Sequence, residues 1–411
     1  MKAYERFITY VKTHTASSET SESVPSSDCQ FTLCHMLADE MRALGLEGVY
    51  EDEHAYVYGF IPASEGYEDK PCIGFIAHLD TIPDFPGENV QPQLIENYDG
   101  GNVVLGTSGR SLTVEKFPHL ATLKGQTLIT TDGTTVLGAD DKAGIAAIMT
   151  AAERIINEKR PHGRVAVCFT PDEEIGHGAA LLDLERLGAD FAYTVDGEEL
   201  SEINYETFNA ASAKWEVNGF NIHPGSAKNM MINASLVAME INSMLPSGDT
   251  PAHTEGYEGF FHLTDMEGNV ESAELKYIIR DHDAAGFDAR LALLRRIADD
   301  INASLGDGTV TLTIREQYRN MAEKIQPHMH LIRNAERAAR SVGAEPAVHP
   351  IRGGTDGARL SFMGLPCPNL GTGGYAFHGP YEHITVEGMD TETAILLELV
   401  RLYADRAGDA D

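Results

Sequence analysis

Acidic residues and histidines follow several short apolar runs of this chain, at points where each run gives way to a turn. The positions are His78 with Asp80, Asp140 with Asp141, Glu173 with Glu174, Asp196 and, far downstream, His378. Parallel strands of an open α/β sheet end at one edge, where side chains from separate strands can meet. Carboxylates and imidazoles are the ligands that a pair of Zn²⁺-like ions requires, and one further carboxylate can act as a general base. The pattern therefore predicts a metallohydrolase site at a sheet edge.

The apolar runs before these clusters lack the alternation of a half-exposed strand. Residues 72–77, 165–170 and 191–195 are apolar almost throughout, which favours buried parallel strands. The Ala- and Ile-rich segment 143–156 lies between two of them and predicts a crossover helix. We therefore expect a doubly wound α/β sheet that carries the clusters at the carboxyl ends of its strands.

The pattern changes near residue 209. Strand-like and helix-like segments then follow in the order βαββαβ, at 213–220, 230–244, 259–265, 274–281, 285–305 and 310–316. This order is typical of a ferredoxin-like unit, which covers one sheet face with helices and leaves the other face available for contacts. We predict an inserted domain at 209–317 and a discontinuous catalytic domain at 1–208 and 318–411.

A Ser/Thr-rich stretch, 13–27, precedes a predicted helix. The four residues from Ser27 to Gln30 match a capping box, in which the side chains of the first and fourth residues bond to backbone N–H groups at the helix start. Leu33, Leu37 and Leu44 recur at helical spacing before Gly45. The pattern predicts a core-facing helix that ends at this glycine.

Charge and cysteine usage restrict the partners and the compartment. Across 411 residues, 63 Asp and Glu against 31 Lys and Arg give a formal charge of −32, which repels nucleic acid and anionic membranes. The five cysteines are odd in number and scattered, which indicates a reducing compartment. No apolar run has the length of a membrane span or the pattern of a signal peptide. We expect a cytoplasmic protein that binds neither nucleic acid nor membranes.

Each cluster taken singly also has an ordinary structural explanation. A His-x-Asp triplet can be a capped turn, Asp140 and Asp141 can cap a helix, and Asp196 before a glycine can form a turn. Glu173 and Glu174 can lie in a solvated acidic loop, although three consecutive acids after a buried strand repel one another unless a cation neutralises them. The joint occurrence of all five clusters favours the metal site, with Asp140 bridging two metals and Asp141 capping the following helix.

The motifs themselves resemble a known family. They are His78-Leu-Asp80, Gly138-Ala-Asp-Asp-Lys-Ala-Gly144, Pro171-Asp-Glu-Glu-Ile-Gly176, Val195-Asp196-Gly and His378. This series resembles that of the di-zinc exopeptidases related to aminoacylase and carboxypeptidase G. Further stretches, around His223, Arg280 and Arg352, are similar to the tripeptide aminopeptidases within that family. The resemblance covers essentially the whole chain and implies a zinc-exopeptidase-like mixed sheet with an inserted lid or dimerisation domain.

The resemblance also implies a ligand set. Two Zn²⁺ ions per subunit, with Co²⁺ or Mn²⁺ as substitutes, would be bridged by Asp140. His78 and Asp196 would hold one ion, and Glu174 and His378 the other. The remaining implied roles are those of Glu173 as general base and Asp80 as the residue that orients His78. The peptide bond between Asp140 and Asp141 would be cis.

The implied reaction is release of the N-terminal residue from small peptides, tripeptides first, by a hydroxide shared between the metals. His223 would stabilise the oxyanion, while Arg280 and Arg352 are candidates for the substrate's carboxylate. The topology is compatible with a homodimer through the inserted domain. Two alternatives stay open: a related amidohydrolase acting on N-acyl amino acids or dipeptides, and an acidic scaffold or metal store without turnover.

Overall fold

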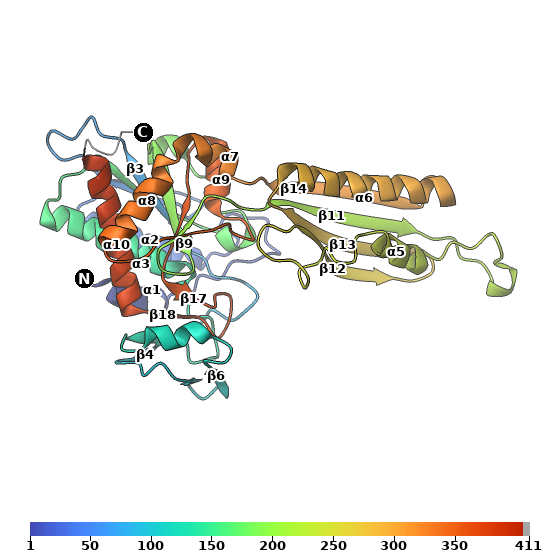
Figure 1. Ribbon diagram of the computed structural model, residues 1–411, viewed down its shortest axis with the longest axis horizontal. Coiled ribbons are helices and arrows are strands. Elements are labelled where there is room, and N and C mark those ends of the chain that lie inside the picture. Colours follow the sequence, from blue (N-terminus) through green and yellow to red (C-terminus); the bar gives the residue numbers. More distant parts are fainter. Residues whose placement is uncertain (406–411) are drawn as a thin grey trace. The chain divides into compact units, whose positions relative to one another are not determined.

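Two compact units make up the chain in the computed structural model, which describes residues 1–405 (Figure 1). The first unit takes in Met1–Tyr205, Glu323–His349 and the chain from Thr355 onward. The second consists of Glu206–Ala322 together with Pro350–Gly354. The first unit is therefore discontinuous in sequence, and the chain returns briefly to the second unit at Pro350–Gly354.

An eight-stranded mixed sheet forms the first unit, in the order β1-β2-β8-β3-β9-β16-β10-β15. In chain order its strands are β1 (Glu47–Glu51), β2 (Val57–Ile61), β3 (Ile73–His78), β8 (Val165–Thr170), β9 (Phe191–Gly197), β10 (Glu202–Asn204), β15 (Ala347–Val348) and β16 (Asn369–Gly371). The central strands β8, β3, β9 and β16 are parallel, so their carboxyl ends meet at one edge. This confirms the predicted α/β fold class.

Helices cover both faces of this sheet, and every residue of β3 and β8 is therefore buried. α3 (Ala139–Glu158) packs against β3 and β9, with α1 (Ala3–Tyr10) and α10 (Val386–Ala404) beside it. On the other face, Cys168 of β8 shares an apolar cluster with Leu187 and Leu360, which lie on α4 (Leu184–Leu187) and α9 (Asp356–Met363). α2 (Gln30–Leu44) contacts β1 and β2, and α8 (His330–Ser341) contacts α10. Burial on two faces explains the continuous apolar runs of the sequence.

A smaller sheet in the same unit was not predicted. It has the order β17-β18-β7-β4, formed by β17 (Gly374–Tyr375), β18 (His383–Thr385), β7 (Leu128–Thr130) and β4 (Gln93–Ile95). A hairpin of β5 (Val103–Leu105) and β6 (Arg110–Leu112) accompanies it. Strands of two or three residues give too little periodicity to be found in a sequence. The loop between β17 and β18 carries His378.

The second unit has the predicted βαββαβ order. It consists of β11 (Asn209–Asn218), α5 (Ala234–Ser243), β12 (Phe260–Gly268), β13 (Ser272–Asp281), α6 (Ala284–Leu305) and β14 (Val310–Tyr318). The strands form an antiparallel sheet, β12-β13-β11-β14, whose inward residues pack with the helices around Trp215 and Phe287. Burial alternates along β11 and β13, so one sheet face is core and the other is exposed. This confirms the ferredoxin-like unit.

The predicted capping box at the start of α2 was wrong. The N-cap is Cys29, and no side chain caps the helix. The Gln30 side chain instead hydrogen-bonds Asp172, 142 positions away in sequence, because that residue's buried carboxylate lies within reach. The predicted end of the helix is confirmed, since Gly45 has the left-handed φ of 93° that terminates α2.

The described part of the chain, residues 1–405, has no helix that is both long and apolar enough to cross a membrane. All five cysteines are free thiols, and four of them are buried. The chain is therefore held together by packing and hydrogen bonds rather than by disulfides.

Candidate functional site

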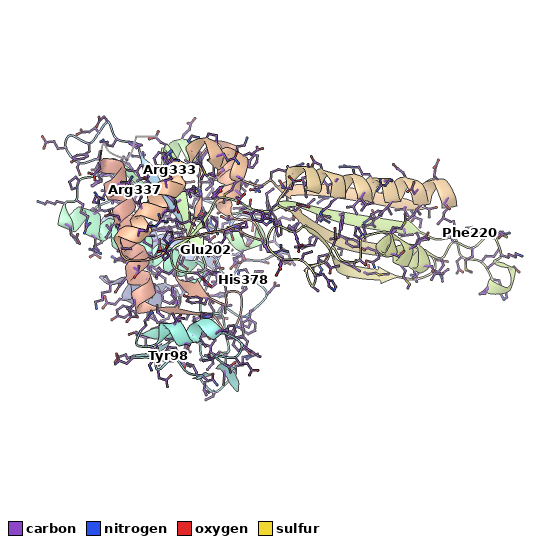
Figure 2. All side chains as sticks on the ribbon, in the orientation of Figure 1. Tyr98, Glu202, Phe220, Arg333, Arg337 and His378 are labelled. Carbon is purple, nitrogen blue, oxygen red and sulfur yellow. The ribbon has the colours of Figure 1, made fainter. Side chains whose placement is uncertain are left out.

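Five elements of the first unit bring the predicted ligands to the carboxyl edge of the main sheet. His78 is the last residue of β3, and Asp196 lies near the end of β9. Asp140 lies in the first turn of α3, where the backbone departs from helical φ and ψ. Glu174 lies in η2 (Glu173–Ile175), the short 3-10 helix after β8. His378, labelled in Figure 2, lies between β17 and β18.

Asp140 occupies the centre of this group. Its Oδ1 lies 2.8 Å from Nε2 of His78, and its Oδ2 lies 3.0 Å from Nε2 of His378. Nε2 of His78 is also 3.3 Å from Oδ1 of Asp196, and Nε2 of His378 is 3.2 Å from Oε2 of Glu174. Two sets of donors thus share one carboxylate, with one oxygen facing each set.

These separations fit two cations. Ligand atoms bound to one Zn²⁺ at about 2.0–2.2 Å lie about 3 Å from one another, which is the spacing found between these nitrogens and oxygens. Donor atoms of His78, Asp140 and Glu174 all lie within 4.8 Å of one another, as do those of His78, Asp141 and Asp196. The donor set of imidazole nitrogens and carboxylate oxygens suits Zn²⁺ and also Co²⁺ or Mn²⁺.

The pKa values of these residues also indicate a site that favours positive charge. Burial raises the pKa of Glu174 to about 7, and the charge of Asp140 adds to this effect. Burial likewise raises the pKa of Asp196 to about 6. For His378, burial lowers the pKa, but hydrogen bonds to Asp140 and Glu174 outweigh burial and raise it to about 11. Carboxylates whose pKa is raised bind protons more readily, and they exchange those protons for a metal ion when one binds.

Asp80 contacts both His78 and the backbone of Glu173 and Glu174. Its Oδ1 accepts a hydrogen bond from the backbone N of Glu173 at 3.0 Å, and its Oδ2 accepts one from the N of Glu174 at 3.2 Å. Nδ1 of His78 lies 3.0 Å from the carbonyl oxygen of Asp80 and 3.3 Å from its Oδ1. Asp80 therefore contacts both η2 and the imidazole, and its backbone carbonyl is the nearer acceptor for the ring.

Glu173 carries the carboxylate next to Glu174, one of the predicted ligands. Burial raises its pKa well above the usual value, and the charge of Asp196 adds to the shift. A carboxylate with this shift has an affinity for protons that suits a general base.

Two acidic residues support the site in ways that the sequence did not indicate fully. Asp141, predicted as a helix cap, does accept from the N of Gly144 at 3.2 Å, but its other oxygen accepts from the N of His78 at 3.2 Å. The peptide bond between Asp140 and Asp141 is cis. Glu382 was missed: it is buried and accepts from the backbone N atoms of Leu137, Gly138 and Asp140 at 2.6–3.0 Å. It had no signal in the sequence, because its partners lie more than 240 positions away.

The other predicted site residues belong to the second unit. His223 is exposed, and its Nδ1 accepts from the N of Gly225 at 3.1 Å. Nη1 of Arg280 donates to the carbonyls of Ala211 at 3.3 Å and Ile279 at 3.0 Å. The guanidinium of Arg352 donates to carbonyls of the loop 254–258, including that of Gly256 at 2.6 Å. Their substrate-binding roles stay predictions.

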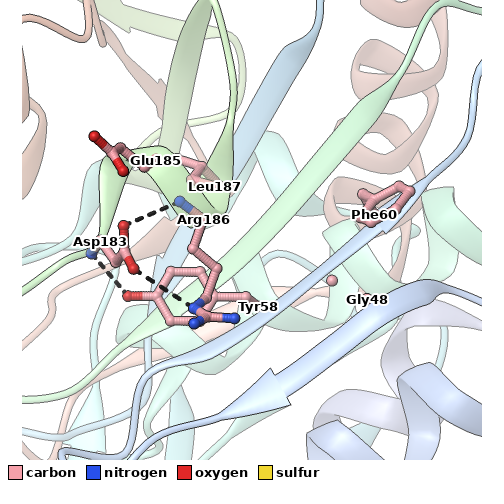
Figure 3. A pocket seen from close by; sticks show the side chains of 8 residues that line it. Gly48, Tyr58, Phe60, Asp183, Glu185, Arg186 and Leu187 are labelled. Carbon is pink, nitrogen blue, oxygen red and sulfur yellow. Dashed lines mark hydrogen bonds and ion pairs between the residues drawn. The ribbon is translucent and has the colours of Figure 1, made fainter.

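A pocket beside α4 is unrelated to the metal ligands. Figure 3 shows it between β2 and α4, with Asp183 and Arg186 3.6 Å apart and the N of Asp183 donating to the hydroxyl of Tyr58. None of the predicted site residues lines it. Asp183 and Arg186 pair with each other there, and no metal-ligand cluster lies among its lining residues.

Residues 136–402 match the model of Peptidase family M20/M25/M40. The chain is 52% identical over 407 residues to a protein named Peptidase T from Halothermothrix orenii, with 98% of this chain and 100% of the relative covered. Among solved structures, it is similar to a tripeptidase from Staphylococcus aureus, with a TM-score of 0.78 and 22% identity, and to aminopeptidase PepT from Bacillus cereus, with 0.77 and 22%. Both alignments cover 98% of each chain.

Proposed function

This chain belongs to Peptidase family M20/M25/M40, and on that premise we propose that it is a metal-dependent aminopeptidase that releases the N-terminal residue from tripeptides. The full-length relative at 52% identity is named Peptidase T, and a solved relative of the same fold is named a tripeptidase. No observation favours an acyl-amino-acid hydrolase or a dipeptidase over this activity, although both need a similar metal site.

One observation supports the chemistry most directly. Asp140 faces His78 with one oxygen at 2.8 Å and His378 with the other at 3.0 Å, so a single carboxylate lies between two donor sets. In the proposal, His78 and Asp196 would hold one Zn²⁺, Glu174 and His378 would hold the other, and Asp140 would offer one oxygen to each. Such a pair, when bound, supplies Lewis acidity and a water nucleophile at neutral pH.

The chain's own residues then handle protons and orientation. Glu173 accepts the proton of the attacking water and passes it to the nitrogen of the leaving amine. Asp80 accepts hydrogen bonds from the backbone N atoms of Glu173 and Glu174, so the base and the neighbouring ligand keep their positions relative to each other. Glu382 accepts hydrogen bonds from the backbone N–H groups of Gly138 and Asp140, and it thereby holds the carboxylate of Asp140 in place.

Recognition of the substrate's ends is assigned to the second unit. His223 donates to the oxyanion that develops on the scissile carbonyl. Arg280 and Arg352 bind the terminal carboxylate with the N–H groups that their backbone carbonyl partners leave available. In this proposal the second unit acts as a lid.

Assembly and location complete the proposal. The helix α5 exposes Leu236 at 62% and Met239 at 61%, which supports a homodimer formed through the second unit. All five cysteines are free, which supports a cytoplasmic location.

A release assay on paired substrates tests the activity. We expect hydrolysis of a tripeptide and none of its N-acetylated form, because an aminopeptidase requires a free amine. Chelation should abolish turnover, and added Zn²⁺ should restore it. Equal hydrolysis of both substrates would favour the amidohydrolase, and undiminished activity after complete metal removal would end the proposal.

A further inference from the structure

The strap, defined here as residues 13–30, consists of the Ser/Thr-rich stretch 13–27 and the three residues after it, and it contacts a residue next to each of three site motifs. Lys142, two positions after Asp140, donates through Nζ to the carbonyl of Thr13 at 2.9 Å. Thr81, next to Asp80, donates to the carbonyl of Thr15 and accepts from both N and Oγ of Ser17, at 3.0–3.3 Å. The third contact is to Asp172, next to Glu173. A segment without a role in the reaction thus lies along the site.

Asp172 is the most fully engaged of these residues. It is completely buried, and its Oδ2 accepts from the N of Ser26 at 2.7 Å. Its Oδ1 accepts from Oγ of Ser26 at 2.5 Å and from Nε2 of Gln30 at 2.7 Å. The backbone N of Asp172 donates back to Oε1 of Gln30 at 3.3 Å. All three donors to this carboxylate come from the strap.

The backbone of Asp172 explains why these contacts reach the reaction. Its φ is 55°, in the left-handed region that non-glycine residues adopt only when their surroundings hold them there. This turn sets the direction in which Glu173 leaves the end of β8. On the following side, Asp80 holds the N atoms of Glu173 and Glu174. Two buried carboxylates therefore fix η2 from both sides.

We propose that Asp172 is a positioning residue, through which the strap holds the carboxylate of Glu173 in its reactive place. The inference rests on the proposed role of Glu173 as general base. Loss of the strap contacts lets residue 172 leave its left-handed conformation, which rotates the peptide plane that precedes Glu173. Binding of the substrate does not depend on this rotation, so the loss falls on kcat rather than on KM.

An exchange of hydrogen-bonding groups tests this. Asp172→Asn turns one acceptor oxygen into a donor that faces the donors of the strap, and Gln30→Glu sets two carboxylates against each other. We expect each single variant, compared at equal metal content, to lose kcat by roughly 10- to 100-fold with KM unchanged. The double variant Asp172→Asn/Gln30→Glu restores a donor opposite an acceptor and keeps the charge of the pair. It should recover most of the lost kcat.

Two controls separate positioning from general stability. Tyr403→Phe removes a buried hydrogen bond, 3.0 Å long, between Tyr403 of α10 and Tyr193, and should lower Tm while leaving kcat unchanged. If Asp172→Asn does not fold, Ser26→Ala removes only one donor and should give a smaller loss of kcat in the same direction. A wild-type kcat in Asp172→Asn, or a double variant no better than the single ones, would overturn the proposal.

Glu173→Gln distinguishes this proposal from the one on which it rests. Turnover retained in that variant would remove Glu173 as the base. An inactive Glu173→Gln beside a fully active Asp172→Asn would leave the base in place and refute only the positioning role.

Discussion

Asp140 shows how one residue can organise a site. Burial raises its pKa, but hydrogen bonds from His378 and His78 outweigh burial and keep the pKa below its usual value. It therefore stays ionised among carboxylates that tend to be protonated. An ionised bridging oxygen on each side is what two cations need in order to bind close together.

Substitution of Glu173 separates catalysis from metal binding. Glu173→Ala should lower kcat by about 10²- to 10⁴-fold with metal content unchanged, because a general base is lost while the proposed ligands remain. His378→Ala, in contrast, should lose metal. Metal analysis and peptide release on both variants check this. An active Glu173→Ala would contradict the assignment.

Arg280 provides a second test at this scale. Arg280→Ala should raise KM for free tripeptides much more than for C-terminally amidated ones, because only the former carry the carboxylate that Arg280 is proposed to bind. Arg319→Ala is the matched control, since Arg319 lies in the same unit and pairs with Glu316 and Asp288. It should affect both substrates alike. Equal effects of Arg280→Ala on the two substrates would refute the carboxylate contact.

The close approach of α3 to β9 positions two of the predicted ligands at once. Asp140 lies in the first turn of α3 and Asp196 near the end of β9, and Gly144 lies where the two elements meet. A Cβ on Gly144 would lie 1.9 Å from the carbonyl oxygen of Val195 and 2.4 Å from Oδ1 of Asp141. Only a glycine allows the helix this near to the strand.

Gly144→Ala should therefore damage the site through packing. α3 has to move away from β9, which costs about 1–3 kcal/mol of stability and separates Asp140 from Asp196. We expect a lower Tm together with weaker metal binding. Gly248→Ala is the control, because a Cβ there meets no atom within 4 Å. Unchanged metal affinity in Gly144→Ala would show that the spacing of α3 and β9 does not set the ligand geometry.

One buried acid outside the site should make the stability of the fold depend on pH. Glu392 of α10 is 1% exposed, its Oε1 has no hydrogen-bond partner, and burial raises its pKa to about 8. The unfolded chain releases this proton near pH 4.3, whereas the folded chain keeps it to about pH 8. The folded state therefore binds more protons in this window, and stability falls as pH rises through it.

Glu392→Gln should remove that loss. The variant keeps the shape of a protonated glutamate, so its free energy of unfolding should equal that of the parent near pH 4.5. The difference should then grow by roughly 1.4 kcal/mol per pH unit in the window and reach a few kcal/mol at pH 8.5. Denaturant unfolding at several pH values with metal present checks this. A difference that does not grow with pH would show that Glu392 titrates normally.

The order of the longer helices and strands was predictable because it depends on local patterns. The βαββαβ order of the second unit followed from periodicity within each segment, and β3, β8 and β9 were recognised from apolar runs that two-faced burial requires. The ligand motifs were visible for the same reason, since each adjoins such a run. Glu382 was missed because it acts on backbone N–H groups, which leave no trace in the identity of the partner residues.

Side-chain type and periodicity are properties of short segments, so the amino-acid sequence specifies which chemical groups are present and which elements carry them. Which of those groups meet depends on the packing of segments that lie far apart in the chain. Gln30 illustrates this: its local pattern predicted a helix cap, yet its side chain bonds Asp172, because a buried carboxylate must find donors wherever the fold brings them. The meeting of His78, Asp140 and His378 likewise depends on the packing of distant segments.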